Sequence, residues 1–382
     1  GSRGWLSDPP LSTFARMTQR DEVRRLFERQ RECGRFPGGQ LVVRQGGEVV
    51  LDVVTGIARG FRPSEGEEAV PVTPTTRFAV FSASKPVVAL ALAMLEERGA
   101  IDVNAPVAKY FPEFAANGKS ELTVLEVLTH RACVFTPDLL ASPRDWGNEE
   151  KVRDALVRAK PRFPRGTLAY MPYEYGWILA EVVRGATGRR LDEFIHTEIS
   201  AAAGIPGLRF GAVASELAGL AKTYWLSSGS VKVAGVELSK TFEHDNNLPE
   251  VLTAFVPGAG LVCTASDLAA FYEVLVRGGV TRSGKRLVTA ETLALYTTAG
   301  GAAYDRSNRL PLRVGRGFLL GSLTPSIYGW WGTQRCFGHA GAFCTLAWAD
   351  PERDLAVAIV TNGNRGPYES LFRFAPLGTG LR

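Results

Sequence analysis

The apolar positions of this chain change their spacing several times, and each change marks an expected element. In residues 21–33 the apolar side chains recur at intervals of three and four between charged ones, which predicts an amphipathic helix. Residues 40–45 and 48–54 are two apolar, β-branched runs joined by a pair of glycines, which predicts a hairpin with a two-residue turn. The polar, proline-containing residues 59–76 are expected to form a loop.

A short strand-like run, residues 78–81, leads into the apolar residues 86–95. The second run is apolar on nearly every side, which predicts a buried helix, and Gly99 after Arg98 is a suitable end for it. The other expected helices are 123–129, 149–159, 175–184, 191–202, 267–277 and 368–374, and the other expected strands are 342–349 and 355–360.

This order predicts an α/β protein of the α+β type. Strands from both ends of the chain are expected to pair into one central antiparallel sheet, with helices on its faces. Residues 1–99 and 246–382 would form this discontinuous sheet domain, and residues 100–245 a mostly helical subdomain. The active site is expected between the two.

Composition limits the classes of protein and of partner. Hydrophobic residues make up 45% and charged residues 22% of the 382 residues, which is typical of a soluble globular chain. The net charge is +5, but no block of like charges occurs, so we expect no nucleic-acid partner. Residues 86–95 are too few to span a membrane, so we expect no membrane partner. The sequence leaves the oligomeric state open.

The cysteines and histidines argue against a metal site. The five cysteines contain no CxxC pair, and the four histidines contain no HExxH pattern, so we expect no metal and no cofactor. Reduced cysteines and the lack of a secretory hydrophobic region favour a cytoplasmic location. Gly1 and Ser2 resemble a scar of tag removal, which is compatible with a native leader that was trimmed.

The tetrapeptide Ser82-Ala83-Ser84-Lys85 carries the candidate chemistry. Side chains three residues apart share one face of a helix, so Lys85 can reach the Ser82 hydroxyl. A serine becomes a nucleophile when a neighbouring base takes its proton. A lysine serves as that base when desolvation lowers its pKa, and the apolar run that follows offers desolvation. The plain alternatives are a helix-capping serine and a solvated surface lysine.

Two later segments, residues 166–177 and 337–342, carry the other motifs on which a family resemblance rests. With the SxxK tetrapeptide and the segments 122–130 and 260–268, the chain resembles the serine β-lactamase and penicillin-binding-protein superfamily. The resemblance is closest to the class C-like branch, which includes family VIII carboxylesterases and related acyltransferases. It implies a β-lactamase/transpeptidase-like fold.

The resemblance also implies a role for each matching residue. Ser82 would form the acyl-enzyme. Lys85 would deprotonate the Ser82 hydroxyl, or hold a proton network that does. Tyr170 would pass a proton to the leaving group, with its pKa lowered by Lys85. His339 would stand where most β-lactamases carry the lysine of a KTG motif. The backbone N–H groups of Ser82 and Ala342 would form the oxyanion hole, and Gly341 would let the substrate approach closely.

Two departures from the β-lactamase pattern favour esters. Pro172 stands where the family usually has an asparagine that binds a β-lactam side chain, and His339 replaces a carboxylate-binding lysine. Both leave Ser82, Lys85 and Tyr170 in place. We therefore expect a serine hydrolase, or an acyltransferase, that acts on small-molecule esters. The alternatives are a β-lactamase or DD-peptidase, and a non-catalytic sensor on the same fold.

Several aromatic residues are open to two interpretations. Tyr328, Trp330 and Trp331 are either core residues or an apolar wall of the substrate-binding pocket. Tyr173 and Tyr175 are expected in the core, where either is easily mistaken for the catalytic tyrosine. The resemblance favours Tyr170 because of its spacing from the following Gly-Trp pair.

Overall fold

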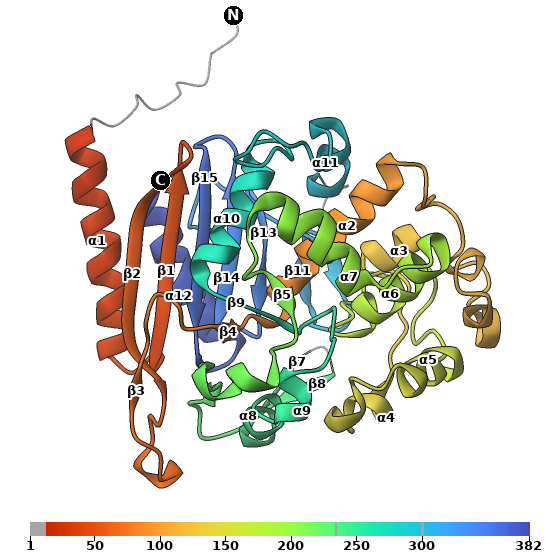
Figure 1. The fold of residues 1–382 in the computed structure, drawn as a ribbon, viewed down its shortest axis with the longest axis horizontal. Coiled ribbons are helices and arrows are strands. Elements are labelled where there is room, and N and C mark those ends of the chain that lie inside the picture. Colours follow the sequence, from red (N-terminus) through yellow and green to blue (C-terminus); the bar gives the residue numbers. More distant parts are fainter. Residues whose placement is uncertain (1–12, 234, 299–301) are drawn as a thin grey trace, which may run out of the picture.

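A seven-stranded antiparallel sheet forms the centre of the molecule in the computed structural model, which describes residues 13–233, 235–298 and 302–382 (Figure 1). The strand order is β12-β13-β14-β15-β1-β2-β3. The first and last parts of the chain meet where β1 pairs with β15, with Gly39 opposite Thr361. The predicted fold class is therefore confirmed. The strands are β1 (Gly38–Gln45), β2 (Glu48–Arg59), β3 (Val70–Pro71), β12 (Leu319–Leu320), β13 (Phe337–Gly341), β14 (Thr345–Asp350) and β15 (Leu355–Thr361).

Alternating side chains of the sheet enter two separate cores. Leu41 and Val43 of β1 pack beneath α1 (Thr13–Glu32) and α12 (Pro367–Gly380), with Phe27 and Phe374 of these helices. Val42 points to the other face, because successive side chains of a strand alternate. On that face lie α2 (Lys85–Glu97) and α10 (Ala265–Val276). The candidate site lies on the α2 face.

The helices of the middle of the chain lie together beyond α2, at the right of Figure 1. They are α3 (Val124–Leu128), α4 (Pro137–Leu140), α5 (Glu149–Arg158), α6 (Glu174–Thr187) and α7 (Leu191–Ile195), which continues as a π-helical stretch, His196–Ala201. The helices that follow are α8 (Lys240–Asn246), α9 (Pro249–Leu252) and α11 (Ala290–Thr297). The division into a sheet domain and a helical subdomain stays a prediction.

Small sheets connect these parts. β4 (Phe78–Ala79) and β5 (Arg209–Phe210) both pair with β9 (Leu261–Cys263), so the approach to Ser82 is anchored to the segment before α10. The other pairs are β6 (Tyr224–Trp225) with β16 (Gly363–Asn364), β7 (Val231–Val233) with β8 (Val236–Leu238), and β10 (Ala303–Asp305) with β11 (Leu310–Leu312). No helix within the described ranges is long and apolar enough to cross a membrane.

The strand predicted over residues 342–349 is present, but it begins three residues later than predicted. β13 ends at Gly341 and β14 begins at Thr345, and a tight turn separates them. Ala342 and Phe343 have φ angles of 41° and 60°, in the left-handed region, which ends a strand. His339 therefore lies within a strand and not in front of one. This turn brings the Ala342 amide to the end of the sheet.

Candidate active site

Ser82 lies in a sharp turn between β4 and α2. The turn is a short 3-10 helix, Phe81–Ser84, and Phe81 enters it with a φ of 50°. The Ser84 hydroxyl donates to Phe81 O at 2.5 Å and accepts the Leu261 N–H at 3.0 Å, which fixes the turn to β9. Ser82 is half-buried, whereas its neighbours in the turn are buried. The turn thus presents one hydroxyl at the surface of the site.

Lys85 is fully buried beneath Ser82. Its Nζ lies 3.2 Å from Ser82 Oγ and donates to Pro172 O at 2.6 Å and to Gly258 O at 2.9 Å. Burial lowers the pKa of Lys85 to about 7, although the carboxyl group of Glu174 acts in the opposite direction.

In its neutral form, the Lys85 amine can turn its lone pair toward the serine. The two carbonyl oxygens only accept, so each takes one N–H of Lys85. A neutral amine has two N–H groups and one lone pair. The lone pair is then left toward Ser82 Oγ, where it can accept the hydroxyl proton.

Tyr170 stands beside the same pair. Its ring centroid lies 5.1 Å from Lys85 Nζ, and its hydroxyl hydrogen-bonds with Ser82. The expectation of a lowered pKa is wrong. Loss of hydration raises the pKa of Tyr170, and the hydrogen bond with Ser82 offsets only part of that rise. The phenol is therefore neutral, with its hydroxyl beside Ser82. Asp305 accepts the Tyr170 N–H at 3.0 Å and fixes the backbone there.

His130 holds Tyr170 in place, a role that the sequence did not indicate. Its ring centroid lies 4.4 Å from that of Tyr170 and 5.0 Å from that of Tyr175. Its Nδ1 accepts the Met171 N–H at 3.1 Å, so this nitrogen carries no proton. Burial and the nearby charge of Lys85 hold the pKa of His130 well below its usual value. The ring is a neutral spacer between two tyrosines.

His339 projects from β13 into the site as a neutral ring. It is 2% exposed, and its Nδ1 lies 2.6 Å from Ala340 O, which requires the proton on Nδ1. Its buried Nε2 has no hydrogen-bond partner among the described residues, and the ring centroid is 6.0 Å from that of Tyr170. Burial lowers the pKa of His339 to about 3, with a smaller effect of Lys85. At neutral pH the His339 ring therefore offers its Nε2 as a hydrogen-bond acceptor and carries no positive charge.

The end of β13 lies directly against the turn that carries Ser82. A side chain at Gly341 would overlap the carbonyl oxygen of Val80, so the two backbones touch. Ser82 is in the first turn of its helix, where an N–H has no intrahelical acceptor. The carbonyl group of Ala342 accepts from the Asn364 side chain, which steadies the next turn. The predicted oxyanion-hole amides of Ser82 and Ala342 thus come from adjoining segments.

Replacing Gly341 by alanine tests this close approach. The new methyl group would push β13 from the Ser82 turn, and we expect the free energy of unfolding to fall by about 1–3 kcal/mol. The catalytic rate on an ester should fall as well, because the Ala342 amide moves. Urea unfolding and kcat measure the two effects. Gly219→Ala is the matched control, since a side chain there meets nothing within 4 Å. Equal losses in both variants would contradict the close approach.

The three aromatic residues considered for a substrate-binding wall lie elsewhere. Tyr328 is fully buried, packs 5.8 Å from Trp348 and donates its hydroxyl to Leu319 O at 2.9 Å. Trp330 packs 6.2 Å from Phe372 on α12, and Trp331 is 65% exposed. All three lie on the α12 side of the sheet, away from Lys85. The predicted substrate-binding role of Tyr328, Trp330 and Trp331 is therefore wrong, and the core interpretation holds for Tyr328.

Two buried carboxyl groups near the site were missed. Glu174 accepts both the N–H and the hydroxyl of Thr136 at 2.8 Å, and burial raises its pKa. A glutamate between two tyrosines in an apolar segment was an available signal. Asp305 lies far along the chain from Tyr170, and no local pattern marks it. Within the described ranges, no group of three histidine, cysteine or acidic side chains is placed to hold a metal ion.

Comparisons with known proteins extend over nearly the whole chain. The family model described as beta-lactamase matches residues 23–375. The esterase/beta-lactamase LipL of Mycobacterium tuberculosis is 28% identical over 352 aligned positions, and the match covers 86% of this chain and 77% of LipL. The structure of a penicillin-binding protein homolog from Caulobacter crescentus is 27% identical, covers 99% of this chain and 98% of its own, and has a TM-score of 0.78. That of a family VIII carboxylesterase is 25% identical, covers 94% and 96%, and has the same TM-score.

Proposed function

The chain belongs to the beta-lactamase family and is a serine hydrolase, and we propose that it cleaves carboxylic esters through an acyl-enzyme on Ser82. The predicted resemblance to the serine β-lactamase and penicillin-binding-protein superfamily is confirmed. One observation carries the proposal: a fully buried amine, Lys85, lies 3.2 Å from a half-buried serine hydroxyl.

The proposed reaction begins with proton transfer from Ser82 to Lys85. Ser82 Oγ then attacks the ester carbonyl carbon, and the negative oxygen that forms is held by the N–H groups of Ser82 and Ala342. The C–O bond to the alcohol breaks, and the neutral Tyr170 hydroxyl relays the proton from Lys85 to the departing oxygen. A water molecule attacks the acyl-enzyme by the same route in reverse, which releases the acid and restores Ser82. An alcohol in place of water would give transfer of the acyl group.

The groups around the centre favour a neutral ester over a penicillin. Pro172 contributes a carbonyl oxygen to Lys85 and has no side-chain amide for a substrate. His339 is neutral, so it cannot pair with the carboxylate that penicillins carry. The similarity to a family VIII carboxylesterase supports this choice. The similarity to the esterase/beta-lactamase LipL is compatible with either substrate class. The penicillin-binding protein homolog, similar over nearly its full length, keeps a penicillin-recognising enzyme as the second candidate.

A labelling experiment tests the nucleophile and the substrate class together. A fluorophosphonate should add one mass adduct to the protein, at Ser82, and none to Ser82→Ala. The protein should hydrolyse p-nitrophenyl butyrate far faster than nitrocefin. A Ser82-dependent nitrocefin rate above the ester rate would favour the second candidate. No adduct and no ester turnover would leave the non-catalytic alternative as the best interpretation.

A further inference from the structure

The turn between β13 and β14 holds a backbone shape that its own residues do not favour. Ala342 and Phe343 are consecutive residues in the left-handed region, and neither is a glycine. Residues with a side chain rarely adopt this region, and such a backbone persists only where the contacts around it hold it. Because the Ala342 N–H is a predicted oxyanion donor, the contacts that hold this turn also direct that donor.

Side chains from two later segments hold the carbonyl oxygens of this turn. The Asn364 amide group donates to Ala342 O, and the Arg373 guanidinium group donates to Phe343 O at 2.8 Å. Arg373 also donates to Gly363 O at 3.3 Å, so it ties the turn to β16. Both acceptors of the turn directly follow the Ala342 N–H along the backbone. The two bonds therefore limit the rotation of that N–H.

Arg373 is a buried cation without a carboxylate partner. It lies on α12, is 2% exposed and keeps its charge at neutral pH, although burial lowers its pKa to about 10. Among the described residues no carboxylate oxygen lies within 4 Å of its guanidinium group, and Glu369 of the same helix pairs with Arg35 instead. The Arg373 Cζ lies 5.7 and 4.5 Å from the ring centroids of Phe36 and Phe374. Because a buried charge is costly, an apolar side chain would serve better here if Arg373 only filled the core.

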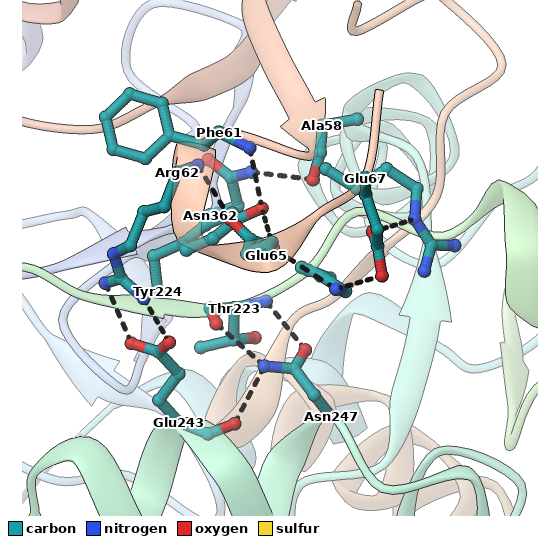
Figure 2. A network of polar contacts seen from close by, with 12 residues as sticks. Ala58, Phe61, Arg62, Glu65, Glu67, Thr223, Tyr224, Glu243, Asn247 and Asn362 are labelled. Atoms are coloured by element: carbon teal, nitrogen blue, oxygen red, sulfur yellow. Dashed lines mark hydrogen bonds and ion pairs between the residues drawn. The ribbon is translucent and has the colours of Figure 1, made fainter. Parts of the chain in front are cut away.

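The segment that carries Asn364 is anchored from another side. Figure 2 shows Asn362, just before β16, bonded to Ala58 O of β2. β16 then pairs in parallel with β6. Within the segment, Asn364 Oδ1 accepts the Gly366 N–H at 2.9 Å, which turns Nδ2 toward Ala342 O. This donor to the turn is therefore fixed before any substrate binds.

We propose that Arg373, together with Asn364, is a positioning residue of the oxyanion hole. Its bond to Phe343 O keeps the turn in the shape that directs the Ala342 N–H at the ester carbonyl oxygen. No bond joins Arg373 to Ser82 in the described structure, so it acts through the turn. It does so from α12, which packs on the face of the sheet opposite to α2. This inference rests on the proposed function and adds two residues to its mechanism.

The kinetics of matched variants test the inference. Acylation and deacylation both pass through a negative oxygen that the bound ester lacks, so weaker support for it lowers kcat and leaves KM nearly unchanged. Because the Ala342 N–H would be displaced and not removed, Arg373→Met should lose about 10- to 100-fold in kcat on p-nitrophenyl butyrate, less than the loss of a whole donor. Asn364→Ala should show the same pattern. Arg373→Lys keeps a charged donor for Phe343 O and should lose less than about tenfold.

Two further readouts separate a displaced donor from general damage. p-Nitrophenyl thionobutyrate carries sulfur in place of the carbonyl oxygen, and sulfur is a weaker acceptor. After correction for spontaneous rates, the unmodified protein should prefer the oxygen ester by more than about tenfold. This preference should shrink several-fold in Arg373→Met and Asn364→Ala. The pH midpoint near 7, which Lys85 sets, should not move.

Arg44→Met is the control for the loss of a buried arginine. Arg44 is 5% exposed on β1, and its guanidinium group pairs with Glu273 of α10 at 2.8 Å. The variant should be less stable, because it leaves a buried carboxylate unpaired. Its folded fraction, measured by circular dichroism, should keep the kcat of the unmodified protein.

The outcomes separate this inference from the proposed function. An unchanged kcat in folded Arg373→Met, an equal loss in Arg44→Met, or an unaltered preference for the oxygen ester would overturn the positioning role while leaving the esterase intact. If Arg373→Met does not fold, Asn364→Ala decides by the same criteria. If no ester shows Ser82-dependent turnover, the proposed function fails and the positioning role fails with it.

Discussion

Replacing Ser82 by alanine should lower kcat/KM for p-nitrophenyl butyrate by about ten-thousand-fold or more, as the loss of other serine nucleophiles does. The variant keeps the buried Lys85, but no other serine hydroxyl among the described residues hydrogen-bonds to its amine. A methyl group in place of the hydroxyl removes the attacking atom and disturbs little else, because Ser84 and not Ser82 ties the turn to β9.

Controls for this variant are available in the chain itself. Ser266→Ala changes an exposed serine on α10 and should leave the rate unchanged. Far-ultraviolet circular dichroism and urea unfolding should show that Ser82→Ala folds as the unmodified protein does. Equal ester rates in Ser82→Ala and the unmodified protein would exclude Ser82 as the nucleophile and end the proposed mechanism.

Replacing Lys85 should have the next largest effect, about a thousand-fold loss in kcat, because the general base and its proton relay disappear together. Lys85→Met removes the amine. Lys85→Arg keeps a cation and its donors, but a guanidinium group does not release its proton at working pH. Both variants should therefore be nearly inactive. Substantial activity in Lys85→Arg would show that Lys85 serves by its charge and not as a base.

The pH dependence provides a second readout of Lys85. With a pKa of about 7, the active neutral amine becomes about tenfold rarer per pH unit below 7 and dominates above it. The ester rate should rise through pH 7 and then level off. His339, with a pKa of about 3, stays neutral throughout this range.

The free energy of unfolding should also depend on pH through Lys85. The unfolded chain holds the Lys85 proton up to its ordinary pKa of 10.5, whereas the folded protein releases it near pH 7. The unfolded state thus binds more protons between these values, so the free energy of unfolding rises with pH there. Urea unfolding at pH 7 and pH 9 should show this rise in the unmodified protein and a smaller one in Lys85→Met.

Elements with a strong local pattern could be predicted from the sequence. The hairpin at Gly46 and Gly47 and the apolar helix after Ser82 appear where their periodicity places them. The pairing of Ser82 with Lys85 also depends on local spacing, and it is present at 3.2 Å. The turn at Ala342 was missed because an apolar run through residues 342–349 carries no mark of a left-handed backbone.

The rest of the site depends on contacts that cannot be predicted from the types of residue involved. The two acceptors that orient Lys85 are backbone carbonyl oxygens of Pro172 and Gly258, and every residue has one. The anchor of Tyr170 is an aspartate far along the chain. The aromatic residues near Trp330 show the opposite error. Their composition is typical of a binding pocket, but such a cluster also occurs where a sheet packs against a helix.

The β1–β15 pair has a consequence for how the protein reaches its native state. β1 is made long before its partner, which is complete only when residue 361 has been added. Contacts between such distant segments slow folding, and an unpaired strand edge invites association with other chains. The β1–β2 hairpin must wait with one open edge until β15 has been made. Chains cut before β15 should therefore aggregate more readily than they fold, and a chaperone that shields this edge should raise the yield of active enzyme.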